Sequence, residues 1–343
     1  MSQTKAELLD PLDGVVSSGD VKINDVSVGK GANSVAGNTV LGENALDASV
    51  SGGNNTAIGL EALTANTSGD GHVSVGRYSL RANTTGINNS AIGFNALKAN
   101  TTASNNTALG NEALTANTTG ANNVGIGTGA LVANTTASNN VAIGHGCLDF
   151  NTTGSENNAV GANTLDANTT GSSNNAFGQG ALGANTTASN NSAFGQSALG
   201  ANTTGTDNTA VGKGALDANT TANNNVAVGR DSMGSNTTGT QNTACGTASL
   251  SSNTTASNNT AIGHQALTLN TTGTNNTSVG NDSLKVNTTG VSNVAVGAQA
   301  LDAATTANNN VAVGRDAGGS VTTGADNVIV GTFAGEDLTT GSQ

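Results

Sequence analysis

The residues that could perform acid, metal or nucleophilic chemistry are few in this chain and lie far apart. Its three histidines are His72, His145 and His264, whereas a metal site brings three or four ligands together. A pair of carboxylates hydrolyses a glycosidic bond only when the two stand within about 10 Å of each other. Acids such as Glu61 and Asp231 are scattered over variable positions. We therefore predict no catalytic residue, no metal and no cofactor, and we expect that the protein is not an enzyme.

One small group of residues is suited to recognition instead. Tyr78 and Phe94 are predicted to occupy neighbouring outward positions, with Arg77 and Arg81 beside them. Aromatic and arginine side chains dominate binding hot spots. We regard these four residues as a possible receptor contact. The alternative is that they are isolated surface residues.

The elements that position these residues follow from a repeat. A glycine that ends a short apolar run recurs at constant spacing from Gly42 to Gly331, and (331 − 42)/17 = 17 steps gives 18 such glycines. One period is Asn106–Asn122, NTALGNEALTANTTGAN. A short period without insertions is typical of a solenoid, in which each repeat is one coil stacked on the previous coil. The spacing predicts an all-β fold, a parallel β-solenoid (β-roll) of 17-residue coils.

Each coil is predicted to hold two short strands, Thr107–Leu109 and Ala113–Ala116 in the period above. Side chains alternate along a strand, so Leu109 and Leu114 are predicted to face each other in the core. Their equivalents are large and apolar in almost every coil. The other core residues that we single out by this rule are Leu182, Phe177 and Phe194.

The same alternation predicts that Ala108 and Ala113 point outward. Their ranks hold almost only Ala or Ser along the chain, although a solvated face should vary freely. Small residues kept along two lines suggest that another backbone packs closely there. We therefore predict a homo-oligomer with the alanine ranks, including Ala142, at its interface.

Asparagine is as regular as the apolar residues. Asn106 and Asn123 lie four residues before the repeat glycine, and Asn117 and Asn134 lie seven residues after it. Stacked asparagines can hydrogen-bond amide to amide, and asparagine tolerates the left-handed backbone of a tight corner. The spacing predicts asparagine ladders at the corners of the coils.

Composition narrows the function classes. The chain of 343 residues has 48 glycines, one proline, no tryptophan and 2% aromatic residues, which can fill only a narrow core. Its net charge of −12 argues against nucleic acid, which needs clustered Lys and Arg. No run approaches the 18 apolar residues of a membrane span, and the first residues lack the apolar core of a signal peptide. We expect assembly in a cytoplasm.

The two cysteines, Cys147 and Cys245, are separated by nearly six coils, roughly 28 Å at about 4.8 Å per coil. A disulfide requires Cα atoms within about 7 Å of each other. We predict two separate thiols, both small and buried.

Composition also predicts three segments. Residues 1–25 lie outside the repeat and are expected to be an attachment segment. Residues 26–303 are the regular shaft, starting with one short coil. Residues 304–343 are divergent coils, in which the ladder asparagine and then the core leucine are lost.

The motifs NNTAIG (residues 54–59) and NNVAVG (residues 224–229) resemble the head repeats of trimeric autotransporter adhesins of the YadA type. The longer form, TTGxNNTAIGxxALxAN, is similar to repeats of bacteriophage tail fibres. The resemblance covers residues 26–343 and implies a left-handed β-roll assembled as a parallel homotrimer. The adhesin repeats are usually shorter than the period of this chain. Autotransporters also require a signal peptide and a C-terminal membrane domain, and neither is recognisable here.

From this resemblance we expect a structural fibre protein of a phage tail or virion appendage, a spacer and host-attachment element. It would bind other virion proteins through residues 1–25 and a host receptor or glycan at its far end. A removed C-terminal chaperone domain is one open question. The alternatives are a bacterial surface adhesin or matrix filament and, less favoured, an ice-binding solenoid. Ice-binding faces usually repeat Thr-x-Thr, whereas Thr118 and Thr119 are adjacent and point to opposite faces.

Overall fold

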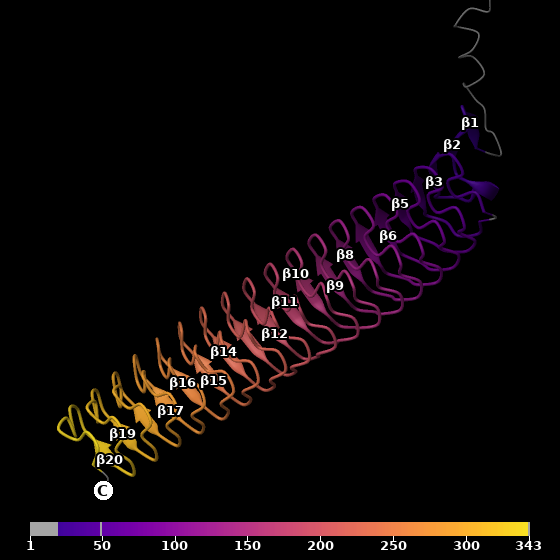
Figure 1. The fold of residues 1–343 in the computed structure, drawn as a ribbon. Coiled ribbons are helices and arrows are strands. Elements are labelled where there is room, and N and C mark those ends of the chain that lie inside the picture. The colour runs from indigo at the N-terminus through magenta and orange to yellow at the C-terminus, as the bar shows by residue number, and fades with distance from the viewer. Residues whose placement is uncertain (1–19, 49, 342–343) are drawn as a thin grey trace, which may run out of the picture. The chain divides into compact units, whose positions relative to one another are not determined.

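The computed structural model describes residues 20–48 and 50–341, and it is an all-β parallel solenoid in which each turn is one repeat period. The predicted fold class is therefore confirmed. The chain divides into two units, residues 1–122 and 123–343, which are described separately below. In Figure 1 the coils of each unit are stacked one upon the next.

Unit 1 begins with a hairpin and continues as coils that each contribute one short strand. Its elements are β1 (Val21–Ile23), β2 (Val26–Gly29), the 3-10 turn η2 (Ala32–Ser34), β3 (Thr39–Gly42), β4 (Thr56–Ile58), β5 (Val73–Val75), β6 (Ser90–Ile92) and β7 (Thr107–Leu109).

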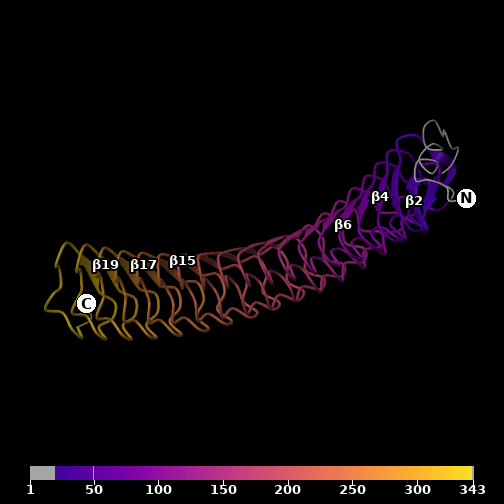
Figure 2. The ribbon, with the colours of Figure 1, turned by 90° about the horizontal axis from the view of Figure 1, so that it is seen from above.

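Unit 2 contains only such coils among its described residues (Figure 2). Its strands are β8 (Val124–Ile126), β9 (Val141–Ile143), β10 (Asn158–Val160), β11 (Asn175–Phe177), β12 (Ser192–Phe194), β13 (Thr209–Val211), β14 (Val226–Val228), β15 (Thr243–Cys245), β16 (Thr260–Ile262), β17 (Thr277–Val279), β18 (Val294–Val296), β19 (Val311–Val313) and β20 (Val328–Val330).

Parallel pairing places each residue on its equivalent one repeat period later. Ala159 of β10 pairs with Ala176 of β11, and Thr56 of β4 pairs with Val73 of β5 in the same way. Because the period has no insertion, a slip by one residue would turn every side chain of a strand to the wrong face. The constant spacing therefore fixes the register of both units.

The start of unit 1 differs from the prediction. We expected a short first coil from residue 26, but β2 is the middle strand of an antiparallel arrangement, paired with β1 on one side and β3 on the other. Regular parallel coils begin only at β3. An exposed sheet edge is an aggregation hazard, and β1 and β2 cover this one. Residues 1–19 of the predicted attachment segment lie outside the described residues.

The predicted second strand is instead a turn with left-handed residues. Glu112 has φ 60° and Leu114 has φ 54°, values that an extended strand does not allow. From Gly59 to Gly331 the repeat glycine that precedes each turn also has a positive φ, which is 131° at Gly127. A Cβ on Gly127 would lie 2.5 Å from the carbonyl oxygen of Gly144 in the next coil, which explains why this position is always glycine.

The turn decides which side chains form the core. Ala113 and Leu114 are consecutive but both are fully buried, because the backbone between them is not extended. Ala108 is only 1% exposed, on the same side as Leu114, and Leu109 is 44% exposed. The core is thus a rank of leucines, including Leu182, packed against ranks of alanines. Burying one leucine contributes about 1.5–3 kcal/mol.

The prediction that Leu109, Phe177 and Phe194 belong to the core is wrong in this chain. The alternation along the strand was right, but the large residue faces outward and the alanine faces inward. The prediction that the alanine ranks point outward to a second copy is also wrong, because these alanines are buried in the chain's own core. Ala108 and Ala142 are therefore not available to a second copy.

Candidate functional site: an apolar face and a cationic aromatic cluster

The strands of both units present one large apolar residue per coil to solvent. We call this rank the apolar face. In unit 1 it consists of Leu41, Ile58, Val75, Ile92 and Leu109, and in unit 2 of Ile126, Ile143, Val160, Phe177, Phe194, Val211, Val228, Cys245, Ile262, Val279, Val296, Val313 and Val330.

Two phenylalanines on adjacent coils stack on this face. Phe177 and Phe194 pair across β11 and β12, with ring centroids 5.0 Å apart and planes inclined by 6°. They are 39% and 41% exposed. Monomeric soluble proteins rarely expose contiguous apolar patches larger than roughly a few hundred Å². A rank that runs along all the coils of unit 2 is an unusual surface for a protein that remains alone.

The predicted asparagine ladders are present and fully buried. In the rank before the glycine, the Asn140 backbone N–H donates to Asn123 Oδ1 at 3.0 Å, and Asn106 is bonded in the same way to Asn89. In the rank after the glycine, Asn117 Nδ2 donates to Asn100 Oδ1 at 3.1 Å.

In the regular coils the two ladders meet at one backbone carbonyl. In unit 2, the Ala137 oxygen accepts Asn123 Nδ2 at 2.9 Å and Asn134 Nδ2 at 3.1 Å. Buried polar groups are costly unless they are paired, so these contacts explain why asparagine recurs at both positions. The ladders hold the coil corners together.

His72 stands in the first ladder of unit 1 and reproduces the hydrogen bonds of an asparagine. Its Nδ1 accepts the Asn89 backbone N–H at 3.2 Å, and the ring also bonds to the Gly86 backbone. The imidazole is therefore neutral with its hydrogen on Nε2. Burial lowers the pKa of His72 below its ordinary value of 6.5, although the bond to the Gly86 backbone and the charge of Asp70 oppose the shift.

The two thiols differ, which corrects the prediction that both are buried. Cys147 is buried and donates to the Ala159 carbonyl at 3.2 Å. Burial raises its pKa to about 12, which makes it a poor nucleophile. Cys245 is exposed and belongs to the apolar face. Both are free cysteines, as predicted.

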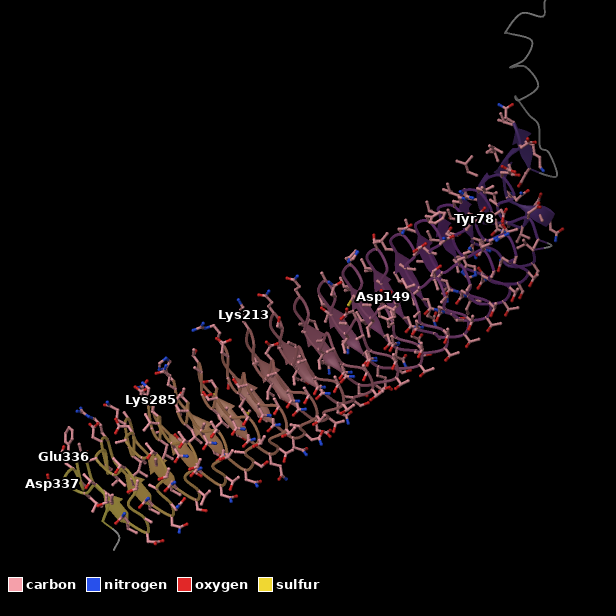
Figure 3. The ribbon with its side chains drawn as sticks, in the orientation of Figure 1. Tyr78, Asp149, Lys213, Lys285, Glu336 and Asp337 are labelled. Carbon is pink, nitrogen blue, oxygen red and sulfur yellow. The ribbon has the colours of Figure 1, made fainter. Side chains whose placement is uncertain are left out.

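The four predicted contact residues of unit 1 do come together, and a fifth joins them. The Tyr78 and Phe94 ring centroids are 6.4 Å apart. The Arg77 guanidinium lies 4.5 Å from the centre of the Tyr78 ring, and that of Arg81 lies 5.1 Å from it. Lys98 Nζ completes the group at 5.6 Å. We call these five residues the Tyr78 cluster; Figure 3 labels Tyr78.

Sequence reasoning missed Lys98, although a signal was present. Lys98 lies one repeat period after Arg81, so the repeat alone places the two cations in the same rank on adjacent coils. Arg81 forms an ion pair with Glu61, with Nε and Oε2 2.6 Å apart. Within the described part of the chain, no carboxylate is paired with Arg77 or Lys98.

Acidic residues gather elsewhere, in unit 2. Asp149 and Asp166 occupy the same rank on adjacent coils, and partial burial raises the pKa of both. At the last coils, Asp302, Asp316, Glu336 and Asp337 surround a hollow of about 650 Å³ together with Arg315; Figure 3 labels Glu336 and Asp337. Among residues 20–48 and 50–341, no group of three or more His, Cys, Asp or Glu side chains could hold a metal ion.

The described residues contain no helix that is long and apolar enough to cross a membrane. Comparison with known proteins adds no relative, because no protein-family model and no curated protein matches this chain.

Proposed function

We propose that this protein is a structural fibre subunit of a phage tail or another virion appendage, which self-associates along the apolar face and acts as a spacer and host-attachment element. The observation that carries the proposal is the unbroken rank of exposed and half-buried apolar side chains on the strand face of each unit. Full burial of one such side chain is worth about 1.5–3 kcal/mol. Many coils acting together would give a long, stable contact.

A parallel, in-register homotrimer is the assembly that we favour. Each coil offers one apolar residue at the same place, so copies running in the same direction match coil for coil. Parallel register also brings the Phe177 and Phe194 pair of each copy to one level, where aromatic residues meet aromatic residues. The resemblance to trimeric adhesin heads points to the same arrangement. The interface that we propose is thus the apolar face, and not the alanine ranks.

Attachment roles complete the proposal. We assign residues 1–25 to docking on other virion proteins, since they precede the coils and contain the non-repeat residues Leu8, Leu9 and Leu12. We assign host contact to exposed groups on the coils, of which the Tyr78 cluster is the best formed. Virion localisation follows from the same proposal, and a bacterial surface adhesin is the competing assignment.

Light scattering on the purified chain tests self-association. We expect a mass of three times the 33.1 kDa of one chain. Replacing Phe177 and Phe194 together by Glu should yield monomers, because charges at the interface would be desolvated. Phe150→Glu is the matched control, since Phe150 is 59% exposed but lies outside the apolar face. A monomeric parent, or equal effects of the two changes, would contradict the proposal.

Mass spectrometry separates the virion assignment from the adhesin assignment. The chain should be found in virus particles purified from the source organism, and not in the washed cell-envelope fraction. The opposite distribution would favour the bacterial surface adhesin and reject the phage fibre.

A further inference from the structure

We propose that the Tyr78 cluster and the groove beside it bind a carboxylated sugar chain. The inference rests on the host-contact role proposed above and names the chemistry of that contact. Arg77, Arg81 and Lys98 are three of the ten basic residues in a chain of net charge −12, and all three lie against one aromatic ring. Such a concentration of cations favours an anionic ligand.

The groove has an apolar floor and a cationic side. Its volume is about 680 Å³, and it spans four consecutive coils of unit 1. Arg81 and Lys98 belong both to the groove and to the Tyr78 cluster, so the two features form one continuous surface. The lining residues are Thr64, Ala65, Arg81, Ala82, Lys98, Ala99, Thr115 and Ala116.

Two cations are free to bind a ligand carboxylate. Arg77 is held by a bond from its guanidinium to the Tyr78 hydroxyl at 2.9 Å, but no carboxylate of the described chain neutralises it. Lys98 also has no ion pair with a carboxylate of the described chain, whereas Arg81 is paired with Glu61. Arg77 and Lys98 lie 4.5 and 5.6 Å from the centre of the Tyr78 ring, so we expect an acidic group there to gain charge-assisted contacts without breaking an existing ion pair.

The floor favours a sugar over a peptide. Acidic peptides that bind along a β structure usually add a strand, which requires free backbone groups. The backbone N–H groups of Ala65, Ala82 and Ala99 already donate to carbonyls of the next coil, at 3.1, 3.0 and 3.1 Å. The Thr64 hydroxyl donates to the Asn44 carbonyl at 2.9 Å. The floor therefore offers small apolar side chains and the Thr115 hydroxyl, which suit the C–H face and the hydroxyls of sugar rings.

The spacing of the coils supports an oligomeric ligand. Coils are separated by about 4.8 Å, close to the length of one sugar unit in an extended chain. A sugar chain along the groove would therefore meet an equivalent alanine at each step. Its carboxylates would meet Lys98 in the groove and Arg77 beside it, the two cations that have no ion pair within the described residues. The groove shares no residue with the apolar face, so self-association and sugar binding use separate residues.

Calorimetry on the full chain tests the inference, with tetragalacturonic acid and a sialic acid tetramer as probes. The controls are the methyl ester of tetragalacturonic acid and a tetraglutamate peptide. We expect at least one acidic sugar to bind, and its neutral ester to bind about tenfold more weakly or not at all. Binding of neither acidic sugar, or equally tight binding of tetraglutamate, would overturn the proposal.

Variants localise the site. Lys98→Gln and Tyr78→Ala should each weaken binding by about tenfold, with an unchanged circular dichroism spectrum because both side chains lie at the surface. Lys213→Gln is the matched control, since it removes the same charge from unit 2 (Figure 3). If all three variants bind equally, the site is elsewhere and the inference fails. Light scattering on the same samples shows separately whether the proposed fibre assembly holds.

Discussion

The regular coils of unit 2, residues 123–303, and its last coils, residues 304–341, keep one backbone register but fill the core differently. A regular coil pairs leucine in the turn with alanine in the strand. In the last two coils the turn residue is Gly318 or Gly335, and the buried strand residue of the final coil is Ile329 in place of alanine. Ile329 is 6% exposed, and a Cβ on Gly318 would lie 2.9 Å from its Cδ1. In the regular coils the large core side chain comes from the turn, whereas here it comes from the strand.

The ladders differ between these regions too. The ladder after the glycine ends at Asn287, whose Oδ1 is buried and has no hydrogen-bond partner, because Ala304 stands where the next amide would be. The ladder before the glycine continues, and Asn327 Nδ2 donates to Asn310 Oδ1 at 2.8 Å. A coil therefore tolerates the loss of one ladder when the other ladder and the core volume are kept.

The largest expected effect is a charge in the regular core. Leu182→Asp would bury an unpaired carboxylate and should cost on the order of 5 kcal/mol of stability. Gly335→Asp is its counterpart in the divergent coils and should cost less, because Gly335 is exposed and no charge is buried there. Some cost remains, since Gly335 has φ 71° and a Cβ on it would lie 3.2 Å from Ile329 Cγ2. Thermal unfolding followed by circular dichroism measures both. Similar melting temperatures for the two variants would mean that the leucine rank does not form the core.

A double-mutant cycle tests the exchange of core volume. Ile329→Ala should cost about 2–4 kcal/mol through the cavity that it leaves. Gly318→Leu should also destabilise, because the new side chain would collide with Ile329. The double variant recreates the regular pattern and should be more stable than the sum of the two costs predicts. Strict additivity in chemical denaturation would show that the two positions do not share one space.

The ladder can be cut in its middle or at its end. Asn219→Ala removes the acceptor of Asn236 and the donor to Asn202, and should cost about 2–3 kcal/mol. Asn287→Ala removes only two donated bonds, to Asn270 and Gly290, along with the unpartnered oxygen. It should cost about 1 kcal/mol less than the change at Asn219. Equal unfolding free energies would indicate that neighbouring rungs do not support one another.

The smallest expected effect on stability concerns His72, which replaces an asparagine in the ladder before the glycine and keeps its hydrogen bonds. His72 is neutral in the folded chain and its pKa lies below the ordinary 6.5, so the unfolded chain takes up a proton first as the pH falls. Its contribution to stability is therefore complete above pH 6.5 and is lost as the pH falls through the folded-state pKa. His72→Asn should match the parent at pH 8 and exceed its stability at pH 5.

The control for this pH effect is His264→Asn, which changes an exposed histidine of unit 2. Between pH 8 and pH 5 the difference in unfolding midpoint between His72→Asn and the parent should change by more than the difference between this control and the parent. If the difference in unfolding midpoint between His72→Asn and the parent is the same at both pH values, His72 does not act as a neutral member of the ladder.

Much of this fold could be predicted from the sequence because its information is repeated. The constant period fixes which residues stack, and with them the parallel register, the asparagine ladders and the coming together of Tyr78 with Phe94. These relations depend only on sequence distance, so an unbroken period determines them. For the same reason, the sequence alone showed that the last coils lose the asparagine after the glycine and the leucine of the turn.

Only the tertiary structure decided which side of the strand faces inward. Alternation states that Ala108 and Leu109 point in opposite directions, but it does not say which of the two is buried. The answer depends on the left-handed turn at Glu112 and Leu114, which carries Leu114 under the strand and leaves room there only for alanine. The leucine of the turn occupies the narrow interior, so the large residues of the strand remain outside and form the apolar face. The hydrophobic pattern of the sequence contains no distinct signal for this turn.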